Sequence, residues 1–239
     1  MKKIIKQFLH AFGFDIIRYN AARSNAAQLN RIMSEHHINL VLDIGANTGQ
    51  FACYLRDMGY RGQIVSFEPL TSARDNLILN SKRDPLWDIA PQAAIGSTNG
   101  ETTIYISGNS VSSSILNMLD VHAVAAPDSV YIGKEIVPLR RLDSLAKIYV
   151  SDDSILFIKI DTQGYEDRVI EGASELLQQT AVLQLELSLV PLYEGQCLCD
   201  EMIANINALG FYLWAISPVL TDEHSGRLLQ IDATFCKKQ

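Results

Sequence analysis

The stretch Leu40-Val41-Leu42-Asp43-Ile44-Gly45-Ala46-Asn47-Thr48-Gly49 is a short apolar run that ends in a glycine-containing turn. An apolar run of this length predicts a buried strand, here residues 40–44. Gly45 permits tight passage of the backbone, and Gly49 permits close packing of a following helix. Residues 50–58 carry apolar side chains at helical spacing, and Gly59 fits the position that ends such a helix. Because backbone N–H groups at such a turn can approach a ligand closely, we predict a ligand site here.

A second predicted strand, residues 63–67, ends at Glu68, which lies 23 positions after Gly45. A carboxylate at that place can accept hydrogen bonds from both hydroxyls of a ribose. Dinucleotide enzymes use the spacing Gly-x-Gly-x-x-Gly to seat a pyrophosphate, whereas this chain has Gly-x-x-x-Gly with Asp43 before it. A polar turn with an acid suits the ammonium group of S-adenosylmethionine, which has no phosphate. Together the turn and Glu68 favour a nucleoside-type ligand over a structural turn beside a solvated glutamate.

The rest of the chain alternates short apolar runs with longer helical patterns. This order predicts an α/β fold with a doubly wound, Rossmann-like, mostly parallel sheet and an antiparallel closing strand, plus N-terminal helices. Further strands are predicted at residues 87–95, 154–160 and 181–187, hairpin strands at 102–106 and 137–139, and a closing antiparallel pair at 212–216 and 229–235. Helices are predicted at residues 26–37, 71–80 (capped by Thr71 or Ser72), 171–179 and 200–209. Residues 108–133 are expected to form an irregular functional loop. We divide the chain into an N-terminal helical extension, residues 1–36, and a catalytic domain, residues 37–239.

Composition limits the classes of partner. The 239 residues are 48% hydrophobic and 20% charged, which is typical of a globular protein. The net charge of −7, without a basic cluster in the body of the chain, argues against a nucleic-acid partner. Cys53, Cys197, Cys199 and Cys236 lack the density of a disulfide framework and the paired spacing of a zinc site. We therefore expect reduced thiols, a cytoplasmic protein and no metal site.

The first residues, 1–12, are basic and amphipathic. No apolar run approaches the ~20 residues that span a bilayer, and no signal-peptide cleavage pattern is present. The apolar side chains that share one helical face are Ile4, Ile5, Phe8, Leu9 and Phe12, and the lysines Lys2, Lys3 and Lys6 lie elsewhere on the helix. Packing on the domain and weak docking on an anionic membrane surface both fit this pattern. A homo-oligomer is also compatible with the sequence.

Five ordered blocks of the chain are similar to one known family. They are residues 41–51 with Phe67-Glu68-Pro69, residues 141–145, residues 158–166, residues 185–188 with Pro191-Leu192-Tyr193, and residues 232–235. Across about residues 38–236 this pattern resembles the FkbM family of S-adenosylmethionine-dependent methyltransferases. The chain departs from the pattern at Gln163, where many members carry glutamate. The resemblance implies O-methylation, often of sugars in glycolipids or surface polysaccharides, or of secondary metabolites.

Asp161 follows the strand predicted at residues 154–160 and is expected to face the ligand crevice. An alkyl hydroxyl is a poor nucleophile, and a base that takes its proton contributes ~10²–10⁴-fold to the rate. Contact with the amino-acid head of the cofactor and binding of a divalent metal are the alternatives for Asp161. Glu166, Glu186 and His122 are further catalytic candidates. Their alternatives are a helix N-terminal acid, a buried structural carboxylate and a structural histidine, respectively.

These features predict an S-adenosylmethionine-dependent O-methyltransferase that acts on a hydroxyl of a sugar or another small molecule. The predicted cofactor-binding residues are Asp43, Gly45, Ala46, Asn47, Thr48, Gly49 and Glu68, and the predicted catalytic residues are Asp161, His122, Glu166 and Glu186. A nucleotide-dependent oxidoreductase is the first alternative, and the missing third glycine disfavours it. A non-catalytic, nucleoside-binding scaffold is the second, and it has no need of both Glu68 and Asp161.

Overall fold

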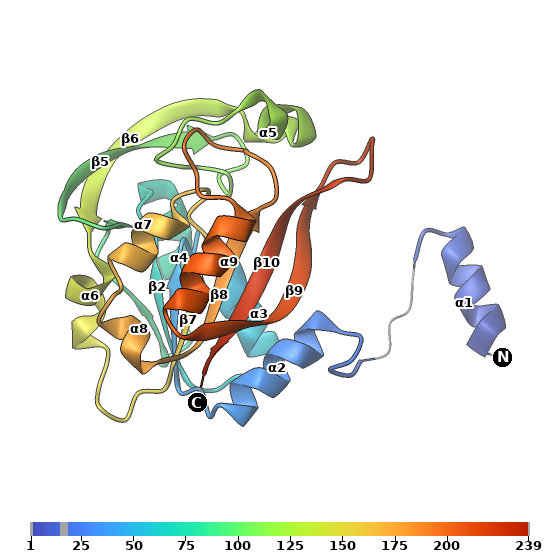
Figure 1. Ribbon diagram of the computed structural model, residues 1–239, viewed down its shortest axis with the longest axis horizontal. Coiled ribbons are helices and arrows are strands. Elements are labelled where there is room, and N and C mark those ends of the chain that lie inside the picture. Colours follow the sequence, from blue (N-terminus) through green and yellow to red (C-terminus); the bar gives the residue numbers. More distant parts are fainter. Residues whose placement is uncertain (1, 15–18, 239) are drawn as a thin grey trace.

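The computed structural model describes residues 2–14 and 19–238, with side chains from residue 7 onward. Its main sheet contains β1 (Leu40–Ile44), β2 (Gln63–Phe67), β3 (Trp87–Ile89), β7 (Leu156–Ile160), β8 (Thr180–Ser188), β9 (Phe211–Thr221) and β10 (Leu228–Lys237). These seven strands follow the order β3-β2-β1-β7-β8-β10-β9 (Figure 1). β10 is antiparallel to both of its neighbours, and the other pairs are parallel. The predicted fold class, with its antiparallel closing strand, is confirmed.

Helices cover both faces of this sheet (Figure 1). One face carries α2 (Asn25–Glu35), α3 (Gln50–Asp57) and α4 (Thr71–Ser81), and the other carries α6 (Leu142–Leu145), α7 (Glu166–Glu171), α8 (Leu176–Gln179) and α9 (Cys199–Ala208). Alternate residues of each central strand therefore enter different buried clusters, as Leu42 and Val41 of β1 do. Ile32 and Met33 of α2 pack in the same cluster as Val41, so the apolar face of this helix lies against the sheet. The domain division at residue 36 stays a prediction.

A smaller sheet contains β4 (Ala94–Ile95), β5 (Gly100–Ser107) and β6 (Tyr131–Arg140), in the order β4-β6-β5. The antiparallel pairing of β5 with β6 confirms the predicted hairpin strands, although both are longer than predicted. The third strand predicted within residues 87–95 is confirmed as β3, but it ends at Ile89, and the same range also contains β4 of the small sheet. Pro91 lies between them and has no N–H to donate to a strand ladder.

Three local predictions are wrong. The helix predicted at residues 171–179 is interrupted after Gly172, where a Cβ would lie 2.0 Å from the backbone oxygen of Gly96. Residues 108–133 are not irregular throughout, because they contain α5 (Asp120–Ala125), a short 3₁₀ turn and the start of β6. The N-cap of α4 is Leu70, and no side chain caps it. Gly59 does end α3 as predicted, with a φ of +96°.

The order of the sheet reverses at its centre. The chain proceeds from β1 outward to β3, and β7 then returns to the other side of β1. Ligands of open α/β sheets bind outside the carboxyl ends of the strands at such a reversal. The loops after β1, β2, β7 and β8 therefore surround the candidate site.

Candidate active site

The glycine turn lies at the carboxyl end of β1 and depends on the absence of side chains. Gly45 has a φ of +78°, and a Cβ there would lie 1.8 Å from the backbone oxygen of Asp161. Gly49 has a φ of +94°, and a Cβ there would lie 2.6 Å from the ring of Trp87. Both the left-handed backbone and the close contacts favour glycine. Ala46 is buried between them, so the turn is packed tightly against the sheet.

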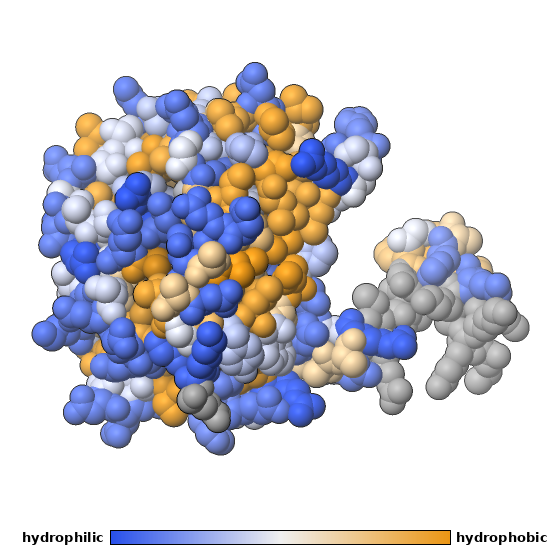
Figure 2. Space-filling view, viewed as in Figure 1, coloured by the Kyte–Doolittle hydropathy of each residue, from blue (hydrophilic) through white to orange (hydrophobic). Residues whose placement is uncertain are grey.

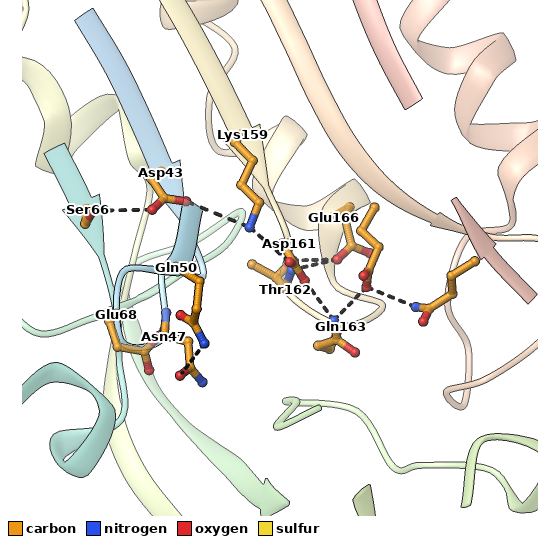
Figure 3. A network of polar contacts seen from close by, with 12 residues as sticks. Asp43, Asn47, Gln50, Ser66, Glu68, Lys159, Asp161, Thr162, Gln163 and Glu166 are labelled. Carbon is orange, nitrogen blue, oxygen red and sulfur yellow. Dashed lines mark hydrogen bonds and ion pairs between the residues drawn. The ribbon is translucent and has the colours of Figure 1, made fainter. Parts of the chain in front are cut away.

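Glu68 joins the tips of β1 and β2. One carboxylate oxygen accepts a hydrogen bond from the backbone N–H of Asn47 at 2.8 Å, and the other accepts one from Leu70 at 2.8 Å. Glu68 is 5% exposed, and burial raises its pKa to about 7. The N–H of Thr48 is bonded to the side chain of Asn47 at 2.8 Å. The structure thus brings the glycine turn and the ribose-binding candidate together (Figure 3).

A first cavity of about 60 Å³ opens beside this turn. Gly45, Asn47, Glu68 and Asp161 line it, and the serine-rich residues 110–115 form another part of its wall. The side-chain amide of Asn47 donates to Ser110 Oγ at 3.2 Å and ties this segment to the turn. A space of this volume holds water but no nucleoside. The serine-rich segment therefore covers part of the candidate site next to the glycine turn.

Lys159 is a buried cation that the sequence analysis did not single out. Its Nζ lies 2.9 Å from Asp161 Oδ2 and 3.8 Å from Asp43 Oδ1 (Figure 3). Burial lowers the pKa of Lys159, but the two carboxylates together outweigh this and raise it above its ordinary value. The period-2 alternation of β7 was a usable signal, because it places Lys159 and Asp161 on one face.

Asp43 is fully buried. It lines neither the first cavity nor a second cavity, described below, that Glu186 faces. Its Oδ2 accepts a hydrogen bond from Ser66 at 3.3 Å, and burial raises its pKa. Asp43 is linked to the site through Lys159, whose Nζ lies 3.8 Å from its Oδ1, and its predicted contact with the cofactor stays a prediction.

Gln163 connects two of the predicted catalytic carboxylates. Its side-chain amide donates to Asp161 Oδ1 at 2.7 Å and to Glu186 Oε2 at 2.6 Å. The hydroxyl of Tyr193 donates to the amide oxygen of Gln163 at 2.7 Å, which fixes the orientation of the amide. A glutamate in place of Gln163 would add a third carboxylate and remove the donors. The departure from the family pattern thus fits the charges around it.

Glu166 and Glu186 have different surroundings. Glu166 accepts hydrogen bonds from the N–H of Thr162 at 2.8 Å and of Gly164 at 3.0 Å, and it lines neither cavity. It stabilises the turn before α7, and burial raises its pKa to about 7. Glu186 faces a second cavity, of about 420 Å³, which Asp161 and Lys159 also line. Burial, followed by the neighbouring acids, raises the pKa of Glu186 well above its ordinary range.

His122 is not brought to these carboxylates. It lies on α5, is 2% exposed and packs edge-on against Tyr193 with ring centroids 5.1 Å apart. It lines neither cavity, and burial lowers its pKa. Within residues 2–14 and 19–238, no group of three His, Cys, Asp or Glu side chains is arranged to hold a metal ion.

Comparison with solved structures shows methyltransferases of low sequence identity. The methyltransferase FkbM of Methylobacillus flagellatus KT is 12% identical with a TM-score of 0.47, and the match covers 82% of this chain and 43% of that one. The 1,6-didemethyltoxoflavin-N1-methyltransferase of Burkholderia thailandensis, with bound S-adenosylhomocysteine, is 10% identical with a TM-score of 0.48 and coverages of 90% and 78%. The fibrillarin of Aeropyrum pernix, with bound S-adenosyl-L-methionine, is 10% identical with a TM-score of 0.45 and coverages of 82% and 66%. No curated protein matches the chain.

The sheet order, the glycine turn and the acid at the tip of β2 define a Rossmann-like protein of the methyltransferase class. The chain belongs to the FkbM methyltransferases, since the family model described as the methyltransferase FkbM domain matches residues 43–213. The family predicted from the sequence is confirmed. Membership supports S-adenosylmethionine-dependent methylation in general.

Proposed function

We propose that the protein transfers a methyl group from S-adenosylmethionine to a hydroxyl oxygen of a sugar, in a glycolipid or polysaccharide, or of a secondary metabolite. The observation that carries this proposal is the hydrogen bond from Asn47 to Glu68 beside a cavity that Asp161 also lines. This arrangement fits the cofactor, because the backbone of the glycine turn borders the cavity and the carboxylate of Glu68 can accept hydrogen bonds from ribose hydroxyls. When bound, S-adenosylmethionine supplies an electrophilic methyl group on its sulfonium.

In this proposal the residues of the chain divide into cofactor-binding and acceptor-binding groups. Glu68 accepts the ribose hydroxyls, and the backbone of the glycine turn accommodates the amino-acid head. Asp161 takes the acceptor's hydroxyl proton as the O–C bond forms and the S–C bond breaks, with its electron pair left on sulfur. Gln163 and Lys159 hold the Asp161 carboxylate between the two cavities. Alignment of donor and acceptor in this cleft provides the remaining acceleration.

Substitution of Glu68 by alanine tests the cofactor site. Calorimetry should detect S-adenosylmethionine binding to the unmodified chain and at least about tenfold weaker binding to Glu68→Ala. The matched control is Glu101→Ala, because Glu101 is exposed on β5 and lines neither cavity. Tight NADH binding without any S-adenosylmethionine signal would instead favour the oxidoreductase. Cofactor binding without transfer of labelled methyl to any hydroxyl compound in a sugar screen would favour the scaffold.

The same residue predicts a pH dependence of cofactor affinity. Because burial raises the pKa of Glu68 to about 7, this carboxylate becomes protonated in the cofactor-free protein as the pH falls through neutrality. Only the ionised form accepts both ribose hydroxyls, so binding should weaken by up to about tenfold per pH unit below 7. The Glu68→Gln variant lacks this titration and should lack that part of the pH dependence. An identical profile in both proteins would contradict the assignment.

Among residues 2–14 and 19–238, no helix is long and apolar enough to cross a membrane. For α1 (Lys2–Ala11) we propose weak docking of residues 1–12 on an anionic membrane surface by a cytoplasmic protein. Phe8 and Phe12 are 62% and 64% exposed, and the coloured part of this helix lies apart from the body of the molecule in Figure 2. These observations favour docking over packing on the domain. Vesicles with phosphatidylserine should therefore bind the protein better than neutral vesicles do. Equal binding would contradict the role of the lysines.

A further inference from the structure

On one face of the sheet, the side chains of the central strands change from apolar to polar toward the carboxyl ends of the parallel strands. On the face covered by α2 and α3, an apolar row crosses β1, β7, β8 and β10 through paired positions Val41, Phe157, Val182 and Cys236. The next row toward the carboxyl ends of the parallel strands is polar and consists of Asp43, Lys159, Gln184 and Thr234. One further step along β8 and β10 pairs Glu186 with Asp232. The opposite faces of these strands stay apolar throughout.

Most of these polar side chains have low exposure, but they border a cavity and are not surrounded by core residues on all sides. Gln184, Glu186 and Thr234 are 7%, 8% and 9% exposed. Desolvation of polar groups is costly, and an apolar face would pack as well as the opposite one does. All members of the polar rows except the fully buried Asp43 line the second cavity, of about 420 Å³, whose other walls come from α2, α3 and β9. These polar side chains of β7, β8 and β10 therefore form one wall, called here the polar floor, of a cavity large enough for a ligand.

The second cavity borders the proposed reaction centre through one shared residue. Asp161 lines both this cavity and the smaller one beside Glu68. A molecule in the second cavity therefore meets the carboxylate that also borders the cofactor site. Tyr54 and Trp214 lie in the wall of the same cavity and offer aromatic surface.

Acidic side chains outnumber basic ones on this polar floor of the cavity. Asp161, Glu186 and Asp232 line the cavity, and Lys159 is its one cation among the described residues. That ammonium is already held by Asp161, at 2.9 Å, and by the buried Asp43. The other partners of the acids are neutral amides: Gln163 and Gln230 donate to Glu186, at 2.6 and 3.0 Å, and Gln184 bonds to Asp232. Burial, followed by repulsion from Asp161, raises the pKa of Asp232 to about 6, although Lys159 acts in the opposite direction.

We propose that the second cavity binds a methyl acceptor that carries a protonated amino group beside its reacting hydroxyl, as in an amino sugar or amino alcohol. This inference rests on the proposed function and specifies its substrate class. Asp232 holds the ammonium group as an anion, Glu186 accepts a hydrogen bond from it, and the neighbouring hydroxyl points to Asp161. The ammonium is an anchor and not the nucleophile, since its nitrogen has no free electron pair. S-adenosylmethionine carries a single net positive charge. The cofactor therefore compensates only part of the negative charge of the acidic side chains, and a cationic acceptor can compensate the rest.

The binding test compares three probes that differ at one position: glucosamine, N-acetylglucosamine and glucose. Each is titrated into protein saturated with S-adenosylhomocysteine. Glucosamine should bind at least about tenfold more tightly than either neutral sugar. Asp232→Asn should remove this preference and leave the affinity for glucose unchanged. The control Asp222→Asn should keep the preference, because Asp222 lies in the exposed β9–β10 turn outside the cavity.

A second readout does not depend on turnover. Because a bound cation favours the ionised form of Asp232, glucosamine binding near pH 6 should release protons, which calorimetry in buffers of different ionisation enthalpy detects. Circular dichroism checks that Asp232→Asn is folded. Equal affinity for all three probes, no amine binding at millimolar concentration, or an unchanged preference in Asp232→Asn would overturn the inference. If S-adenosylhomocysteine binds and neutral sugars are methylated in preference to amines, the inference alone fails. If the cofactor does not bind, the proposed function fails as well.

Discussion

Replacement of Asp161 by asparagine is expected to lower the rate constant of methyl transfer by about 10²–10⁴-fold, the usual contribution of a general base. Asparagine has the same size and can still accept the hydrogen bond from Gln163, but it cannot take a proton. Asp161 lines both cavities and its side chain is 27% exposed, so an acceptor hydroxyl can reach it. S-adenosylhomocysteine should still bind, since the ribose acceptor Glu68 is untouched.

Single-turnover transfer of a labelled methyl group, measured over a range of pH, checks this prediction. At saturating S-adenosylmethionine the unmodified chain should transfer the label about 10²–10⁴-fold faster than Asp161→Asn at each pH. Asp167→Asn is the matched control, because Asp167 lies on α7 a few residues away and lines neither cavity. An Asp161→Asn rate within about tenfold of the unmodified chain would contradict the role of base. Loss of transfer in a folded His122→Phe variant would move that role to His122.

Gly45→Ala should lower the free energy of unfolding by about 3 kcal/mol or more. Two costs combine: an alanine at a φ of +78°, and a Cβ that would lie 1.8 Å from the backbone oxygen of Asp161. That oxygen belongs to the backbone of a central strand end, so relief of the contact must separate β1 from β7. Any folded Gly45→Ala protein should also bind S-adenosylmethionine more weakly, because the cofactor approaches the same turn.

Gly59→Ala separates the two costs. Gly59 has a φ of +96° and no neighbouring atom within 4 Å of an added Cβ, so it carries only the backbone strain, about 1–2 kcal/mol. Urea unfolding of the two variants measures the difference. If Gly45→Ala were no less stable than Gly59→Ala, the close approach of the turn to Asp161 would not be a constraint on this fold.

Local sequence determined the elements whose signals lie within a few residues. The apolar run 40–44, its glycine turn and Glu68 23 positions beyond Gly45 predict the first βαβ unit. The period-2 pattern of residues 181–187 and the helical spacing of residues 50–58 were sufficient for β8 and α3. These signals are reliable because the strand period, the helix period and the conformational freedom of glycine act locally.

Tertiary structure alone decided which of these elements meet. The pairing of β7 with β1 places Lys159 between Asp43 and Asp161, residues that the sequence analysis treated as separate contacts. The pairing of β8 with β10 places Asp232 opposite Glu186, although the block 232–235 does not indicate by itself which strand it pairs with. Strand order and register depend on contacts between residues far apart in the chain, and a local pattern contains no record of them. The same reason explains why residues 87–95 divide between two sheets and why the predicted catalytic His122 lies outside both cavities.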